Sequence, residues 1–255
     1  MHDTLTVCAL GATPYREGLA LQDALVRARA NGETGDWLLY PDHPSVLTVG
    51  RSPSEGNLRA DAATLATLGV EVFEVPRGGD VTWHGPGQLV GYPIVGLDRV
   101  GRDLHRWLRT LEEALIRVLA GHGIVSDRSP GRTGVWVGER KIASIGVAVR
   151  RWVGYHGFAL NVHPDLSAFS LIHPCGLKGV EMTSMALELG AKAPSLEAVR
   201  DDVTRQLSQL LEYDRAEAAP PAAARHWMQR AARAAENPTQ SAPEPDTRTG
   251  GTTRW

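Results

Sequence analysis

The feature that most constrains this chain is a glycine-rich run at residues 77–93, RGGDVTWHGPGQLVGYP. Five of its 17 residues are glycine and two are proline. Because glycine has no Cβ, such a segment lets backbone N–H groups approach a ligand closely. Residues 70–76 alternate as a strand does, and residues 89–95 read as a second strand. We therefore expect a binding loop that is anchored at both ends to a sheet. A glycine-rich hairpin with a solvated His84 is the alternative.

The run does not match the common nucleotide-binding loops. It lacks the Gly-Lys-Ser/Thr ending of a phosphate-binding loop, and a strand follows where that loop requires a helix. The same strand argues against the dinucleotide-binding fingerprint. A nucleotide site of either kind is therefore not expected here.

Charge and hydropathy exclude several classes of protein. The 255 residues carry a formal net charge of −2, which argues against bulk nucleic-acid binding because that requires a basic face. No stretch reaches the roughly 18 apolar residues of a membrane span, and the N-terminus lacks the basic segment of a secretion signal. The two cysteines, Cys8 and Cys175, indicate a cytoplasmic protein with reduced thiols, with a disulfide between them as the alternative. No Cys-x-x-Cys or His-x-x-x-His spacing occurs, so no metal site is expected.

Hydrophobic periodicity predicts a mixture of strands and helices. The predicted strands cover residues 5–10, 36–40, 45–50, 70–76, 89–95, 134–137, 141–149 and 152–162. The predicted helices cover residues 15–30, 61–69, 103–120, 181–189 and 195–211. Asp103 and Ser195 are expected N-caps, Cys8 a small buried side chain and His43 a solvated turn residue.

Composition changes after Tyr213, which predicts a domain boundary. Residues 1–213 form the expected domain, and residues 214–255 a low-complexity, flexible tail that buries too little apolar surface to order itself. Within that tail, residues 216–236 are alanine- and arginine-rich and are compatible with a short solvated helix.

Four arginines lie at or near the start of the predicted helix at residues 103–120. Arg102, Arg106 and Arg109 share one face of the helix, and Arg99 lies just before it. A solvated helix face is the simpler interpretation. A docking surface for an acidic partner is the alternative.

Two residues outside the glycine-rich run have contexts that suit chemistry. Lys141 begins a predicted strand, where a lysine commonly prevents edge-to-edge pairing. Cys175 lies between Pro174 and Gly176, which predicts a tight loop rather than a core strand. An accessible cysteine in a constrained loop is a candidate nucleophile, and a structural thiol is the alternative.

Taken together, these segments resemble one family, the lipoyl(octanoyl) transferases. The matching motifs follow the family's order: residues 77–88 (RGGDVTWHGPGQ), 134–137 (GVWV), 141–146 (KIASIG), 156–161 (HGFALN) and 174–176 (PCG). The resemblance covers residues 5–212, and the tail falls outside it.

The resemblance implies an α/β fold of the α+β type, a mixed sheet with flanking helices, like the catalytic domain of biotin and lipoate protein ligases. Residues 1–213 would then be an acyltransferase domain that moves an octanoyl group from octanoyl-acyl carrier protein to a lysine of lipoyl domains, the first step of endogenous protein lipoylation. The implied acceptors are the lipoyl domains of 2-oxoacid dehydrogenase complexes and the glycine cleavage H protein. No cofactor, nucleic acid or membrane is implied.

The resemblance also implies the site. Cys175 carries the acyl group as a thioester, and Lys141 lowers the pKa of its thiol. The implied substrate-binding residues are Arg77, Gly78, Gly79, Asp80, Val81, Thr82, Trp83 and His84, then Ser144, Ile145 and Gly146, then Gly157, Phe158 and Ala159.

The implied chemistry is consistent with elementary energetics. A free thiol has a pKa of about 8.5, and an ammonium about 4 Å away favours the thiolate by about 1 kcal/mol or more. Thioester exchange followed by amide formation needs no ATP. Backbone N–H groups near Cys175 or in the glycine-rich run, or else His84, would bind the oxyanion. The alternatives are an ATP-dependent lipoate or biotin ligase, and a silent module that binds acyl groups or lipoyl domains.

Overall fold

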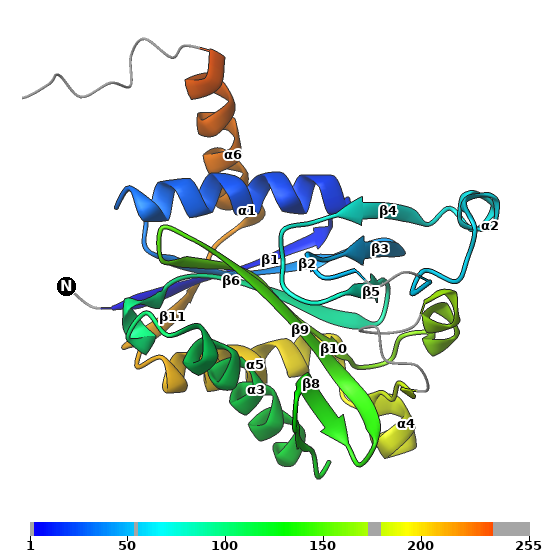
Figure 1. Cartoon of the computed structure of the whole chain (residues 1–255). Helices are drawn as coiled ribbons and strands as arrows, with labels where there is room; N and C mark the ends of the chain where they lie inside the picture. Colours follow the sequence, from blue (N-terminus) through cyan, green and yellow to red (C-terminus); the bar gives the residue numbers. More distant parts are fainter. Residues whose placement is uncertain (1–2, 54–55, 173–179, 237–255) are drawn as a thin grey trace, which may run out of the picture.

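Two β-sheets form the frame of the molecule in the computed structural model, which describes residues 3–53, 56–172 and 180–236 (Figure 1). Within these residues, the larger sheet has eight strands in the order β11-β1-β2-β6-β10-β9-β8-β7, and the smaller has three in the order β4-β3-β5. The larger sheet contains β1 (Thr4–Ala12), β2 (Asp36–Asp42), β6 (Gln88–Gly96), β7 (Asp127–Ser129), β8 (Arg132–Val137), β9 (Arg140–Arg150), β10 (Val153–Asn161) and β11 (Arg215–Ala218). The smaller contains β3 (Val46–Val49), β4 (Glu71–Glu74) and β5 (Val81–His84). Parallel and antiparallel pairs occur in both sheets, so the predicted mixed sheet is confirmed.

Helices cover both faces of the larger sheet (Figure 1). One face carries α1 (Tyr15–Ala30) and α6 (Pro221–Glu236), and the other carries α3 (Leu104–Gly121) and α5 (Leu196–Leu210). Each pair of helices packs over its own hydrophobic core against the sheet. Shorter segments occupy the connections: α2 (Ala62–Thr67), α4 (Met185–Leu189), η1 (Leu97–Val100), η2 (Leu166–Leu171) and η4 (Gly190–Lys192). This layering is the α/β architecture that the sequence predicted.

The sequence of α3 explains where this helix begins and which face it buries. The carboxylate of Asp103 accepts hydrogen bonds from the backbone N–H groups of His105 at 2.8 Å and Arg106 at 3.0 Å, so the predicted N-cap is confirmed. Losing such a cap costs about 1 kcal/mol, whereas truncating one buried leucine to alanine costs about 2–5 kcal/mol. The apolar stripe therefore contributes most to the position of α3, and its buried members are Trp107, Leu111, Leu115, Val118 and Leu119.

The glycine-rich run is not one loop. Residues 81–84 form β5, which pairs antiparallel with β3, and the run continues into β6. The expectation of a single loop is wrong here because β-branched Val81 and Thr82, followed by aromatic Trp83, favour a strand. The expected anchoring to sheets on both sides is confirmed: the run connects the smaller sheet to the larger one.

The chain remains packed after Tyr213, where we predicted a flexible tail. Strand β11 pairs parallel with β1, and at the same edge Asp3 N donates to the Asp214 carboxylate at 2.8 Å while Asp214 N donates to the Asp3 carbonyl at 2.9 Å. Helix α6 buries Ala224 against the core beneath α1. The tail prediction is therefore wrong for residues 215–236, because Trp227, Met228 and the small alanines of α6 pack against that core. Residues 237–255 lie outside the described residues, and for them the tail stays a prediction.

The described residues contain neither a membrane-spanning helix nor a cluster of metal ligands. None of their helices combines the length and the apolar character that crossing a membrane requires. In the same residues no group of three or more His, Cys, Asp or Glu side chains is arranged to hold a metal ion. The buried position predicted for Cys8 is confirmed.

Candidate active site

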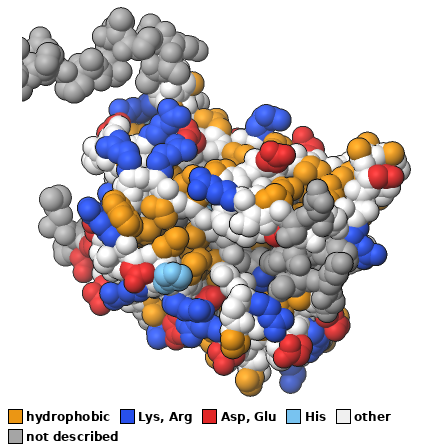
Figure 2. All heavy atoms as spheres, in the orientation of Figure 1, with side chains coloured by type: hydrophobic (Ala, Val, Ile, Leu, Met, Phe, Trp, Pro, Cys, Tyr) orange, Lys and Arg blue, Asp and Glu red, His pale blue; other side chains and the backbone are white. Residues whose placement is uncertain are grey.

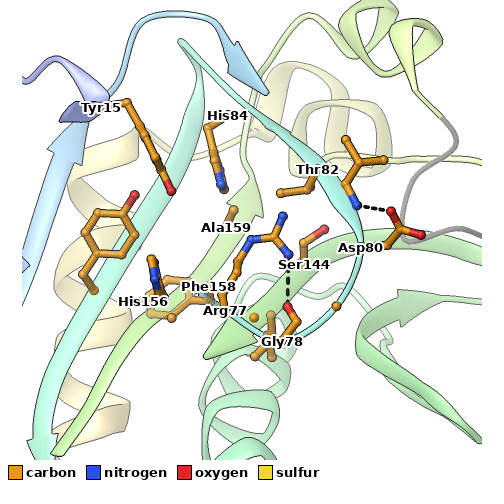
Figure 3. A pocket seen from close by; sticks show the side chains of 16 residues that line it. Tyr15, Arg77, Gly78, Asp80, Thr82, His84, Ser144, His156, Phe158 and Ala159 are labelled. Carbon is orange, nitrogen blue, oxygen red and sulfur yellow. Dashed lines mark hydrogen bonds between the residues drawn. The ribbon is translucent and has the colours of Figure 1, made fainter. Parts of the chain in front are cut away.

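A cavity lies between the smaller sheet and the hairpin of β9 and β10 (Figure 3). The space between its walls, including its open mouth, is about 470 Å³. Of the predicted substrate-binding residues, the structure brings these to the wall: Arg77, Gly78, Gly79, Asp80, Val81, Thr82, His84, Ser144, Ile145, Gly146, Gly157, Phe158 and Ala159. Tyr15, Tyr92 and His156 complete the wall and were not selected from sequence. The geometry thus joins segments far apart in the chain, and their binding role stays a prediction.

Glycines allow the two walls to approach each other. A Cβ at Gly146 would lie 2.9 Å from Cδ of Arg77 and 2.9 Å from the carbonyl oxygen of Gly78, so a larger residue there would displace the segment at residues 77–80. A Cβ at Gly157 would lie 2.2 Å from the carbonyl oxygen of Gly91. The backbone N–H of Gly78 donates to the carbonyl of Val147 at 2.9 Å and fastens the segment to β9. Gly146 therefore lets the two walls approach each other, and Gly157 lets β10 approach β6.

Arg77 is buried in the wall. Its Nη2 donates to the carbonyl oxygen of Thr48 at 2.7 Å and to Oγ1 of the same residue at 2.9 Å, and its Nη1 donates to the carbonyl of Gly78 at 3.0 Å. A planar guanidinium with several directed donors is held in one orientation by such contacts. Arg77 therefore places a fixed positive charge beside the cavity.

His156 is the most unusual residue of the wall. It is 2% exposed and has a φ of 55° in the middle of β10, a conformation that costs a non-glycine residue free energy. Its backbone N–H donates to Oε1 of Gln22 at 2.8 Å, which holds the strained residue in place. Within the described part of the chain, neither ring nitrogen has a hydrogen-bond partner. Burial, with the charge of Arg77 as a smaller cause, lowers the pKa of His156 to about 3, so the ring is neutral at pH 7.

A buried polar network backs the cavity, and it corrects the expectation for His43. His43 is 4% exposed rather than solvated. Its Nδ1 donates to the carbonyl of Thr13 at 2.7 Å, because a carbonyl only accepts, and its Nε2 then accepts from the hydroxyl of Tyr92 at 2.8 Å. The hydroxyl of Tyr92 also interacts with that of Tyr15, and burial raises the pKa of Tyr15 to about 12. Nothing in the local sequence of the turn signals these partners.

Two of the predicted substrate-binding residues, Trp83 and Asp80, make contacts within the protein. The side chain of Trp83 lies on the opposite face of β5, where it stacks edge-on against Phe169 and donates to Oγ of Ser45 at 2.7 Å. The structure therefore does not bring Trp83 to the cavity, since neighbouring residues of a strand point to opposite faces. Asp80 reaches the wall, and its carboxylate accepts from Val81 N at 2.7 Å and Asn57 Nδ2 at 2.5 Å.

Lys141 is 1% exposed at the start of β9, three residues before Ser144 of the cavity wall. Its Nζ lies 5.4 Å from the ring centroid of Trp136. Gly134 leaves room for the side chain of Lys141. Its φ is +127°, and a Cβ there would lie 2.6 Å from Cε of Lys141. The alternative of an exposed lysine that protects a sheet edge is wrong. Cys175 lies outside the described residues.

The predicted arginine face is engaged within the chain. On the side of the molecule seen in Figure 2, basic and acidic side chains are interspersed. Three of the four arginines form ion pairs with neighbouring carboxylates: Arg99 with Asp3 and Asp36, Arg102 with Asp98, and Arg109 with Glu112. The structure therefore gives the docking alternative no specific support, and it stays a hypothesis.

Known proteins share both the sequence and the fold. The family model of the lipoyl protein ligase A/B catalytic domain matches residues 14–208. An octanoyltransferase of Rubrobacter xylanophilus is 51% identical over 196 residues, which cover 76% of this chain and 88% of that protein. An octanoyltransferase of Myxococcus xanthus is 45% identical over 225 residues, 86% of this chain, and the chain spans 63% of that longer relative.

The fold is also seen in a solved structure from Thermoplasma acidophilum, a bipartite lipoate protein ligase described together with its E2 lipoyl domain. It has a TM-score of 0.68 and 20% identity, and the match covers 90% of this chain and 92% of that one. The expected ligase-like fold is confirmed. By sequence, fold and the order of its motifs, this chain belongs to the lipoyl protein ligase A/B catalytic domain family and, within it, to the octanoyltransferases.

Proposed function

We propose that this protein transfers an octanoyl group from octanoyl-acyl carrier protein to a lysine of a lipoyl domain, through a thioester on Cys175. The observation that carries the proposal is the placement of Lys141, a buried cation on the same strand as the cavity residues Ser144, Ile145 and Gly146. The octanoyltransferase relatives support the acyl group, and the lipoate ligase described with its E2 lipoyl domain supports the acceptor.

In the first half-reaction, the thiolate of Cys175 attacks the carbonyl carbon of the octanoyl thioester. A new S–C bond forms, the bond to the carrier's sulfur breaks, and the carrier leaves as a thiolate, which takes a proton from Lys141 and leaves that amine neutral. One thioester replaces another, so this step is close to energy-neutral. The ammonium of Lys141 favours the thiolate form of Cys175 by the attraction of opposite charges in a buried site.

In the second half-reaction, the acceptor lysine attacks as a free amine. An amide bond forms, the Cys175 sulfur leaves, and the amine loses a proton, for which Lys141 in its neutral form is the proposed base. Making an amide from a thioester is downhill, so no ATP is consumed. In this scheme the octanoyl chain occupies the cavity, whose wall includes the small residues Gly146, Gly157 and Ala159.

An ATP-dependent lipoate ligase is the second candidate, and the likeness to a solved lipoate protein ligase favours it. Such an enzyme activates a free acid and needs no nucleophilic cysteine. The Pro174-Cys175-Gly176 motif therefore supports the transferase over the ligase. A cytoplasmic location, and lipoyl domains of 2-oxoacid dehydrogenase complexes and the glycine cleavage H protein as acceptors, are part of the proposal.

Mass spectrometry of the pure protein mixed with octanoyl-acyl carrier protein, without ATP, tests the proposal. We expect an octanoyl adduct on the Cys175 peptide that disappears when a lipoyl domain is added. The variant Cys175→Ser should give no thioester adduct. Product that forms only from free octanoate and ATP would establish the ligase instead.

A further inference from the structure

A chain of buried amide groups holds the ring of His84. Nδ1 of His84 lies 2.9 Å from Oε1 of Gln88, and Nε2 of Gln88 lies 3.0 Å from Oδ1 of Asn161. Nδ2 of Asn161 in turn donates to the carbonyl of Thr183 at 2.9 Å. All four residues are buried, so these polar groups depend on one another for hydrogen bonds.

The direction of every hydrogen bond in this series of side chains follows from its end at the carbonyl of Thr183. A carbonyl only accepts, so Asn161 turns its amide nitrogen to Thr183 and its oxygen to Gln88. Gln88 then turns its nitrogen to Asn161, and the same nitrogen also lies 3.4 Å from the carbonyl of Trp83, which fixes this orientation a second time. The oxygen of Gln88 therefore faces His84, and Nδ1 must carry the proton.

The second ring nitrogen, Nε2, consequently carries a lone pair. Burial lowers the pKa of His84 to about 3, so the ring is neutral at pH 7 and has one N–H, which Gln88 occupies. The ring points into the cavity (Figure 3). This corrects the expectation that His84 donates to an oxyanion: the neutral ring offers the cavity an acceptor.

We propose that Nε2 of His84 accepts a hydrogen bond from an N–H group of the substrate, and that Gln88 and Asn161 are positioning residues that hold this tautomer. The inference rests on the proposed function for the identity of the N–H group. In that reaction there are two sources: the amine of the acceptor lysine and an amide in the thioester arm of the carrier.

The decisive variant is Gln88→Glu. Its carboxylate beside Nδ1 should raise the pKa of His84 and protonate Nε2, so the acceptor becomes a donor. The titratable groups that face the ring are Tyr15, His43, Arg77 and His156, and none of them is changed. As the pH rises through the new pKa of His84, the ring loses this proton and the acceptor returns.

Nitrogen-15 spectra of histidine-labelled protein read the tautomer without any substrate. In the wild type we expect the His84 ring to be protonated on Nδ1 alone from pH 5 to 8. In Gln88→Glu we expect both nitrogens to be protonated at the lower end of this range and Nε2 to lose its proton at the upper end. A wild-type ring protonated on Nε2 would overturn the proposal.

Single-turnover rates separate the two sources of the N–H group. With the acceptor lysine as the source, Gln88→Glu should slow discharge of the octanoyl-Cys175 adduct by about 10- to 100-fold at low pH, as for a lost buried hydrogen bond, and leave its formation unchanged. With the carrier arm as the source, formation should slow instead. Either loss should recover as the pH rises.

A variant whose Nε2 is protonated, but which carries out both half-reactions at the wild-type rates, would overturn the proposal. The transferase function would remain intact. If the wild type forms no adduct at all, the proposed function fails, and the tautomer measurement still stands alone. Gln22→Glu is the matched control, because it buries a carboxylate at similar depth beside His156. Gln22→Glu should leave the protonation of both ring nitrogens of His84 unchanged.

Discussion

Arg77 and Lys141 are both buried basic residues near the cavity, and they differ in their surroundings and in their chemistry. The guanidinium of Arg77 donates to a backbone carbonyl and a hydroxyl of Thr48 and to the carbonyl of Gly78. The ammonium of Lys141 lies over the ring of Trp136, and Gly134 opens the path for its stem. Arg77 is thus braced by several directed hydrogen bonds, and Lys141 has an aromatic face among its neighbours.

The difference suits two different tasks. A guanidinium does not lose its proton in a protein, so Arg77 is a permanent charge and a structural brace. A lysine ammonium can give up a proton when its surroundings change, and in the proposed scheme Lys141 takes part in proton transfer. The two residues are therefore not interchangeable, and the predictions below test that.

The largest expected effect comes from Lys141. Lys141→Ala should lower the single-turnover rate of transfer by about 10²–10⁴-fold, the usual contribution of a positioned acid or base. Lys141→Arg should not restore discharge of the adduct, because a guanidinium cannot act as the base. Quenched-flow measurement of both half-reactions checks this, with the exposed Lys192→Ala as the control. Full activity of Lys141→Arg would show that charge alone is needed.

Arg77→Lys should mainly cost stability. A lysine cannot reach both oxygens of Thr48 and the carbonyl of Gly78 at once, so buried acceptors lose donors. We expect the free energy of unfolding to fall by about 1–3 kcal/mol. Urea denaturation measures it, and an unchanged midpoint would mean that Arg77 does not brace the wall.

The two cavity histidines should make the protein sensitive to acid. In the folded state the pKa values of His84 and His156 are lowered to about 3, below the ordinary value of 6.5. Between those values the unfolded chain binds more protons, so stability falls as the pH falls below 6.5, by up to about 1.4 kcal/mol per pH unit for each histidine. Arg77→Met removes a charge that helps to lower the pKa of His156, so its stability should fall less steeply with acid. Urea midpoints between pH 7 and 4 measure both slopes, and equal slopes would contradict this coupling.

Trp136→Phe should have the smallest effect. It keeps an aromatic ring beneath Lys141 but weakens the attraction, which is worth about 0.5–2 kcal/mol. We expect transfer to slow by about 2- to 10-fold and the tendency of Cys175 to be alkylated near pH 7 to change with it. Arg132 also lies over the same ring, 4.5 Å from its centroid, so Arg132→Gln serves as the control for that face. No change in Trp136→Phe would mean that the ring only packs.

Local sequence predicted the elements whose limits are set by nearby residues. The ends of α1 match the prediction because Pro14 and the Asn31-Gly32 pair stop it on both sides. The motifs also predicted most of the cavity wall, since those segments carry its glycines. Trp83 was misplaced because a motif does not say which face of a strand each residue occupies.

The remaining parts of the site depend on contacts between distant segments. His43 became buried through Tyr92 and Thr13, which lie 49 and 30 residues away in the chain. The left-handed backbone of His156 is compatible with the strand pattern around it and leaves no local signal. The packing of α6 depends on Ala224 and on the partly buried Trp227 and Met228, within a segment whose composition resembles a tail.

The pairing of β11 with β1 has a consequence for how the protein is made. Residues 4 and 215 are partners, so one edge of β1 has no neighbouring strand until more than 210 residues have left the ribosome. Contacts this distant in sequence form slowly, and an open strand edge invites association with other chains in the meantime. The nascent chain therefore carries an open strand edge through most of its synthesis, and the short charged strand β11 covers that edge of β1 at the end.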